Sequence, residues 1–427
     1  MDSWLQFQIN LRALKIVGIF IPIHTWEKPS KLLQTWKFLG IFLYIVLHLL
    51  VIANLLLESK TLGIFSRLMS SYNIFVCTII LLKIVYFSMN SMRIRKLITL
   101  IDEVTAGRTN GWRLRGLSLR EDLYMRRKSA RNCRFISMYI FLVTIGAIFV
   151  FIGTVMLFRT ITIVLDWSKP VNENKQIIRK FRRVTLYHMW WPNKIMELPT
   201  YYFILLWQFF CSMISLTVSC TTDALTCALM LAASERADML AKTAPRALVP
   251  TANRNTLAPA FRAWIRTHQR YLKMMECLMQ VIGPMVFISH TMAFVTFIII
   301  SLGVFKASSN SIGDSIMVAT MLTITVRGLI QLTFMSYSGQ KIIDSSARLS
   351  RSVVNAAQVQ RGLLSRGPNR SALQVLVTRM SVLGDRYAQV SGLGFFTVSM
   401  EFFSSVISGS LSYLLVLLQF KSIVSTI

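Results

Sequence analysis

The chain has 427 residues, of which 54% are hydrophobic and only 15% are charged. Ordinary soluble domains carry about 25% charged residues, so this composition predicts an integral membrane protein. The formal net charge of +29 would favour nucleic-acid binding in a soluble protein, but here Lys and Arg lie in loops between apolar segments. We therefore expect a lipid bilayer and no nucleic acid as a partner.

Windows of about twenty mainly apolar residues, the length that crosses a bilayer core of ~30 Å, recur along the chain. They cover approximately residues 38–57, 72–89, 136–158, 201–231, 278–304, 312–335 and 393–420. The sequence thus predicts an all-α, polytopic membrane protein with seven transmembrane helices. Residues 1–36 are expected to form a cytoplasmic or interfacial segment, because Arg12 and Lys15 interrupt their apolar run.

Basic residues concentrate in alternate loops. The loop at 93–134 and the loops after the fourth and sixth spans are rich in Lys and Arg, whereas residues 58–67 and 306–314 are nearly neutral. The positive-inside rule then places the N-terminus in the cytoplasm and, with seven spans, the C-terminus outside. The basic loop at 159–197 would lie outside, but long loops count for less in this rule.

Charged residues also occur within or beside the apolar spans in residues 37–340. We expect Lys83, Glu276 and Arg327 to extend their polar ends toward the cytoplasmic interface. The alternative is that each has a buried partner or reaches water inside the bundle.

Residues 341–390 are expected to form cytoplasmic helices. Residues 341–360 have the pattern of a moderately polar helix, which glycines and Pro368 then interrupt. Ser371 is a candidate N-cap for a second short helix, too apolar to lie free in water and too short to cross the membrane. We therefore expect these helices to pack as an anchor layer, with ordinary amphipathic loop helices as the alternative.

A polar stripe runs along the last span, within residues 391–427. At about 100° per helical residue, its members fall within about a quarter of the circumference: Thr397, Glu401, Ser404, Ser408, Ser412 and Gln419. The bilayer core offers no hydrogen-bond partners, so such a stripe indicates a pore-lining helix. Serines that let helices approach closely are the alternative. We expect Glu401 to face an aqueous vestibule near the inner mouth and to attract cations.

Two stretches of the sequence resemble the insect odorant receptor family. FMSYSGQKIIDSSARL at 334–349 is similar to the end of that family's sixth helix, and GLGFFTVSMEFFSSVISGSLSYLLVLLQFK at 392–421 is similar to its seventh helix. The most specific part is Ser412-Tyr413, then Val416, then Gln419-Phe420-Lys421.

This resemblance implies four subunits around a central, weakly selective cation pore that the last helix lines, with an odorant pocket in the outer half of each bundle. It implies that Val416 is a hydrophobic gate, with Gln419 and Phe420 beside it. Helical geometry instead places Leu415 and Gln419 inside the polar stripe and Val416 and Phe420 beyond its edge. Either a local helix distortion or a rotated pore-facing angle is then needed.

The segment at 232–273 is compact, whereas the family's shared co-receptor has a long insertion there. The chain therefore resembles an odorant-tuned subunit that assembles with the co-receptor as a heterotetramer in the plasma membrane.

Small volatile ligands require a pocket with aromatic and aliphatic walls. The candidates lie toward the expected outer half of the second, third and fourth spans, and ordinary bundle packing is the alternative for each. They are Tyr72, Phe75, Val150, Gly153, Thr154, Leu157, Tyr201, Tyr202 and Leu205.

Two other functions compete with an odorant-gated channel. A receptor coupled to a G protein would want an external N-terminus and usually a disulfide between outer loops, and a transporter would often show repeated halves. The sequence shows none of these features. Its five histidines have no metal-ligand spacing, and no metalloprotease, phosphate-binding or dinucleotide-binding motif occurs. We therefore expect no enzyme activity, no cofactor and no metal.

Overall fold

The computed structural model describes residues 4–16, 19, 21, 31–57, 64–106, 124, 127–146, 149, 153, 200–248, 257–306, 312–363, 378 and 389–426. The labelled helices are α1 (Trp4–Ile16), α2 (Lys31–Leu57), α3 (Ile64–Met89), α4 (Ser91–Ala106), α7 (Thr200–Leu248), α8 (Leu257–Lys306), α9 (Ile312–Leu363) and α11 (Met400–Thr426). Residues 127–146 form a further helix. A short hairpin, β1 (Ser391–Gly392) and β2 (Phe396–Thr397), precedes α11.

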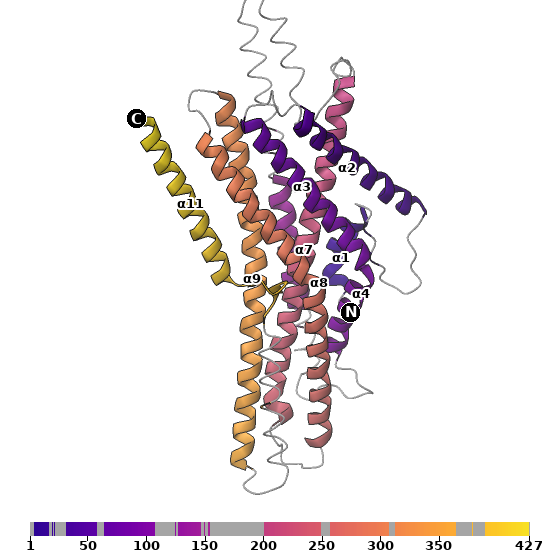
Figure 1. Cartoon of the computed structure of the whole chain (residues 1–427). Helices are drawn as coiled ribbons and strands as arrows, with labels where there is room; N and C mark the ends of the chain where they lie inside the picture. The colour runs from indigo at the N-terminus through magenta and orange to yellow at the C-terminus, as the bar shows by residue number, and fades with distance from the viewer. Residues whose placement is uncertain are drawn as a thin grey trace, which may run out of the picture.

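Helices α7, α8 and α9 form the axis of the molecule, with 49, 50 and 52 residues. A helix of about 50 residues is ~75 Å long, more than twice the bilayer core. Each helix therefore continues well beyond its apolar window, and Figure 1 shows the three running on together past the hairpin. Residues 341–360, expected to be helical, continue α9 without a break.

Helix α7 lies at the centre of this arrangement. Every described side chain from Thr221 to Ser234 is buried, and many of them are Ala, Thr, Ser or Cys. Such small residues let neighbouring helices approach closely, which explains how α7 packs along most of its length against α9.

A proline interrupts the hydrogen bonding of α8. Pro284 has no N–H to donate to the carbonyl of Gln280, the residue four positions earlier. The Tyr86 hydroxyl of α3 donates to this carbonyl at 3.2 Å and to that of Val281 at 2.9 Å. The hydroxyl thus supplies the donor that the proline removes and ties α3 to α8.

The N-terminal helix packs on the bundle. In α1, Phe7 and Leu14 are fully buried, and α1 contacts α7. Asn10 Nδ2 donates to Ser137 Oγ of helix 127–146 at 2.9 Å. These contacts fasten α1 to the bundle, whichever depth in the membrane it occupies.

Among the described residues, four helices are long and apolar enough to cross a membrane. They are Ser70–Met89, Leu206–Ala247, Arg262–Leu302 and Met400–Gln419, and Phe38–Ala53 is a shorter apolar helix. The structure describes only residues 136–146, 149 and 153 of the third expected span, 136–158. The count of seven crossings therefore stays a prediction.

The last helix begins later than the sequence predicted. Residues 391–397 form the antiparallel hairpin, with Ser391 paired to Thr397 and Gly392 to Phe396. Its turn contains Leu393 and Gly394 at φ of +53° and +83°, values that a continuing right-handed helix cannot contain. The prediction that Thr397 belongs to the helical stripe is therefore wrong, because this residue lies in β2.

Candidate functional site

A buried ion pair links four helices at the centre of the bundle. Lys83 Nζ of α3 lies 2.8 and 2.9 Å from the two carboxylate oxygens of Asp223 in α7, and the two side chains are 0% and 1% exposed. Ser289 of α8 donates to Asp223 Oδ1 at 2.8 Å, and Gln331 Nε2 of α9 donates to Oδ2. The carboxylate therefore has a full set of donors.

This network corrects the expectation for Lys83. Its ammonium does not reach the interface, because Asp223 neutralises it inside the bundle. Sequence reasoning overlooked Asp223, although a carboxylate within the apolar window 201–231 was the signal that a cation had a buried partner. Glu276, by contrast, is exposed.

A small cavity lies beside this network, between α3, α8 and α9. Its volume is about 40 Å³, and its lining includes Tyr72, Ser289, Thr296, Arg327 and Gln331. The guanidinium atoms Nε and Nη2 of Arg327 are buried and have no hydrogen-bond partner. The expectation that Arg327 extends its polar end to the cytoplasmic interface stays a prediction, because the residue is half-buried and only these two nitrogens are closed off from water.

Tyr72 is the predicted ligand residue that lines this cavity. Phe75 is half-buried on α3, and Gly153 is exposed. The remaining candidates lie outside the residues or side chains that the structure describes: Val150, Thr154, Leu157, Tyr201, Tyr202 and Leu205. The walls that these residues would form stay a prediction.

The hairpin before α11 is held between α8 and α9. A Cβ added to Gly283 of α8 would lie 3.2 Å from the Ser391 carbonyl, and a Cβ added to Gly339 of α9 would collide with the carbonyl of Val398. At Gly339 only hydrogen lets the backbones approach so closely, whereas at Gly283 a side chain would make a tight contact. The two stretches that carry the family resemblance therefore meet in space where Gly339 touches Val398.

An aromatic cluster connects the hairpin with the first turn of α11. The rings of Phe396 and Phe402 stack at 4.4 Å with an angle of 4° between their planes. His290 of α8 contacts both, at 5.0 and 5.8 Å between ring centroids. Because His290 follows Ser289, which lines the cavity, the part of α8 beside the cavity packs directly against the hairpin and the first turn of α11.

Helix α11 starts with a serine cap. The amide of Phe402 donates to Ser399 Oγ at 3.1 Å, and Glu401 lies in the first turn. A side-chain oxygen satisfies an otherwise unpaired amide at a helix start, and a carboxylate there interacts favourably with the helix dipole. These local features explain why the helix begins here.

The rest of α11 stands away from its own bundle (Figure 1). No residue of Met400–Gln419 is buried inside the subunit. The exposed positions include the predicted pore residues Glu401, Ser408, Ser412, Leu415, Val416 and Gln419. The side chain of Phe420 lies outside the described part of the chain.

The serines of α11 differ in their hydrogen bonding, depending on whether they belong to the polar stripe. Off the stripe, Ser405 donates to the Glu401 carbonyl at 3.1 Å and Ser410 to the Val406 carbonyl at 2.8 Å. On it, the exposed hydroxyls of Ser408 and Ser412 form no hydrogen bond to any described residue. An unsatisfied hydroxyl is costly in hydrocarbon, so this side of the helix needs water or a polar partner.

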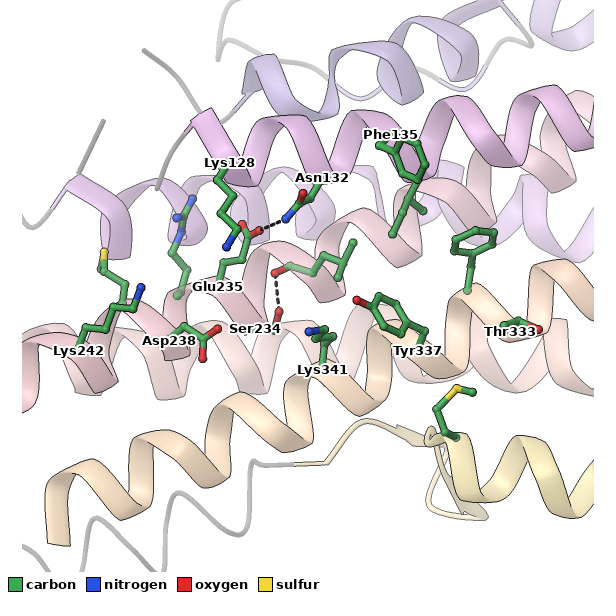
Figure 2. Close-up of a pocket in the computed structure, with 16 residues that line it drawn as sticks. Lys128, Asn132, Phe135, Ser234, Glu235, Asp238, Lys242, Thr333, Tyr337 and Lys341 are labelled. Atoms are coloured by element: carbon green, nitrogen blue, oxygen red, sulfur yellow. Dashed lines mark hydrogen bonds between the residues drawn. The ribbon is translucent and has the colours of Figure 1, made fainter. Parts of the chain in front are cut away.

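A larger cavity of about 520 Å³ adjoins the start of α11, and Met400 lines it. Figure 2 shows Lys128, Glu235, Asp238 and Lys242 gathered at one end and Phe135 and Tyr337 at the other. Asn132 Nδ2 donates to Glu235 Oε1 at 3.1 Å. No spacing in the sequence marks this cavity, because its walls come from helix 127–146, α7 and α9. Its charged end differs from the apolar pocket expected for volatile ligands.

Among the described residues, no three His, Cys, Asp or Glu side chains are grouped so that they could hold a metal ion.

Comparisons with known proteins agree with the arrangement of these helices. A family model described as 7tm Odorant receptor matches residues 65–411. The insect olfactory receptor OR5 from Machilis hrabei has a similar structure, with a TM-score of 0.74, 15% sequence identity and 97% coverage of both chains. The structure of OR5 in complex with eugenol gives a TM-score of 0.75, again with 15% identity and 97% coverage of both chains. No curated protein sequence matches significantly.

Proposed function

The chain belongs to the 7tm odorant receptor family, and on this premise we propose that it is a subunit of an odorant-gated, weakly selective cation channel. The chain is a multi-pass membrane protein. In the proposal it lies in the plasma membrane with a cytoplasmic N-terminus and assembles with the family's shared co-receptor into a tetramer.

The observation that carries the channel proposal is the uncovered state of α11. Its span Met400–Gln419 is apolar enough to cross a bilayer, yet no residue of this span is buried inside the subunit itself. Lipid on every side would leave the hydroxyls of Ser408 and Ser412 in hydrocarbon without partners. If neighbouring subunits surround a shared aqueous pathway, their apolar surfaces cover the leucines of α11 and the water in the pathway hydrogen-bonds to its serines.

Along this pathway, the charged residue and the large apolar residues lie at different depths. Glu401 lies at the inner mouth and attracts cations. Val416 is 15 residues further, ~22 Å along the helix, and a ring of valines there stops ions by dewetting. Leu415, Gln419 and Phe420 complete the constriction, and its polar members give little discrimination between cations.

The ligand enters the outer half of the bundle, where Tyr72 contributes to the cavity beside Arg327. Binding there displaces α8 relative to α9. Because the hairpin lies between these two helices and His290 packs on Phe396 and Phe402, the displacement turns or shifts α11. This route couples odorant binding to the gate through contacts within one subunit.

Cysteine accessibility tests the proposal directly. Ser408→Cys, Ser412→Cys and Gln419→Cys are made in a Cys277→Ser background, because Cys277 is the half-exposed one of the six free cysteines. A water-soluble thiol reagent should block odour-evoked cation current of the tetramer at all three positions. Recording in excised patches removes cytoplasmic nucleotides, so a current that persists there does not depend on a G protein.

Ser410→Cys is the matched control. It introduces the same thiol two residues after Ser408, about 200° around the helix, and its current should resist the reagent. Inert cysteines at positions 408, 412 and 419, both at rest and during stimulation, contradict a pore along this side of α11.

A further inference from the structure

Arg327 carries a charge that the described bundle does not neutralise. Lys83 already pairs with Asp223, and the same carboxylate accepts hydrogen bonds from Ser289 and Gln331. The interior therefore holds two cations and one carboxylate around this point. A buried charge without a partner is strongly unfavourable, so an intramembrane arginine normally marks a functional site.

The unpaired atoms of Arg327 have a defined geometry. Nε and Nη2, the two buried nitrogens without a hydrogen-bond partner, form one edge of the guanidinium group. A carboxylate binds such an edge with both oxygens at once, in two parallel charge-assisted hydrogen bonds. A ligand with a single acceptor atom would accept a hydrogen bond from only one of these two nitrogens.

The adjoining cavity suits the polar head of a small ligand. A water molecule needs roughly 10–15 Å³ of such volume, so the cavity of about 40 Å³ holds about three water-sized groups, the size of a carboxylate. Tyr72, Thr296 and Gln331 add polar atoms to the lining, and Met292 and Phe297 add apolar surface. Among the described residues that line it there is no Asp or Glu.

We propose that Arg327 binds an acceptor group of the odorant, and that the preferred ligands are small volatile carboxylic acids. Ketones of the same length rank next and alkanes last. This inference rests on the proposed odorant function of the same cavity. Since Nε and Nη2 are closed off from water, acid binding turns the guanidinium toward the cavity and so acts on α9, one of the two helices that hold the hairpin.

The test uses the full-length receptor, expressed with the co-receptor for current recording and purified for melting measurements. The probes are straight-chain acids from acetic to octanoic acid, each with a methyl ketone and an alkane of matched length. We expect acids to raise the melting temperature of the wild type and to activate it at the lowest concentration. Hydrogen bonds to charged groups contribute about 1.5–3 kcal/mol, so Arg327→Gln should raise the half-maximal acid concentration by about 10- to 100-fold.

Two further variants separate recognition from folding. Arg327→Lys keeps the charge but loses the two-pronged edge, so it should retain part of the acid response. Arg351→Gln alters an exposed arginine of the same helix whose Nε donates to the Ala347 carbonyl, and it should leave every response unchanged. Without ligand, Arg327→Gln should melt no lower than the wild type, because it removes two buried nitrogens that have no hydrogen-bond partner.

The outcomes distinguish this inference from the proposed function. Equal potency of acids and alkanes, or an acid response that Arg327→Gln leaves intact, overturns the role of Arg327 while the odorant-gated channel stands. An acid-dependent melting shift that requires Arg327, without current at any ligand, supports the binding site and contradicts the channel. A ligand-free melting temperature that falls sharply in both Arg327 variants shows that the guanidinium is structural, and it also overturns the inference.

Discussion

Helices α7 and α11 have similar hydropathy and opposite surroundings. In the apolar span of α7, Leu206–Ala247, 27 of the 42 residues are buried inside the subunit, whereas in α11, Met400–Gln419, none are. Hydropathy sets whether a segment leaves water, but it does not say what covers the segment afterwards. Small side chains let α7 pack against its own bundle, and α11 is left for other molecules to cover.

Polar residues of α7 and α11 differ in the same way: Asp223 of α7 has its partners inside the subunit, and Ser408 and Ser412 of α11 face outward. In α7, Asp223 is satisfied from within, by Lys83, Ser289 and Gln331. In α11, the hydroxyls of Ser408 and Ser412 face outward without a partner among the described residues. A polar group in an apolar helix thus stabilises the bundle in one case and requires an assembly or water in the other.

The largest expected effect comes from breaking the ion pair of α7. Asp223→Leu leaves the Lys83 ammonium buried and unpaired, which costs about 3–5 kcal/mol and should sharply lower the melting temperature and surface expression. Lys83→Met combined with Asp223→Leu should restore much of the loss, because an apolar pair replaces a buried ionic pair at little cost.

An exposed pair provides the matched control for this variant. Arg348 and Asp238 lie 2.9 Å apart with side chains 45% and 37% exposed, so Asp238→Asn should cost at most about 1 kcal/mol. Equal melting temperatures for Asp223→Leu and Asp238→Asn would show that the buried network does not hold the four helices together.

Leucine truncation in each helix compares their surroundings directly. Leu225 of α7 is 0% exposed and Leu411 of α11 is 55% exposed in the subunit. Leu225→Ala should destabilise the bundle by about 2–5 kcal/mol, whereas Leu411→Ala should change subunit stability by no more than about 0.5 kcal/mol.

Melting in detergent measures the change in stability of each variant. Because Leu411 is exposed in the subunit, we expect Leu411→Ala to weaken contacts between subunits instead, and size-exclusion chromatography would show this as a smaller tetramer fraction. A tetramer fraction unchanged by Leu411→Ala, together with equal melting shifts for both variants, would place α11 inside the subunit core and remove the contrast between the helices.

A smaller effect is expected where the two regions meet. Gly339→Ala forces the Cβ against the Val398 backbone, and overpacking of this kind costs about 1–3 kcal/mol. Because the strain acts on the hairpin, we also expect a weaker odour-evoked current at saturating ligand, measured per receptor at the cell surface.

Gly40→Ala is the control, since a Cβ there meets nothing within 4 Å. Alanine is favoured over glycine in a helix by about 1 kcal/mol, so this variant should melt at the same temperature as the wild type or slightly higher. If Gly339→Ala behaves in the same way, the junction does not transmit strain to α11.

Several features could be predicted from the sequence because they depend on neighbours along the chain. Apolar windows located the helices around Lys83, Asp223 and Arg327, and the resemblance at 334–349 and 392–421 named the family that the match to residues 65–411 confirms. The start of α11 was placed too early because an apolar count does not register the turn at Leu393 and Gly394.

Hydropathy and residue order alone determined that this chain is a helical membrane protein with a polar stripe on its last helix, since both are properties of consecutive residues. Tertiary structure alone decided that Lys83 is neutralised by Asp223, 140 positions later, that Arg327 is left with an unpaired edge beside Tyr72, and that Gly339 lies against Val398. The reason is that electrostatic energy and steric fit depend on distances between side chains from different helices, which become short only when the bundle packs.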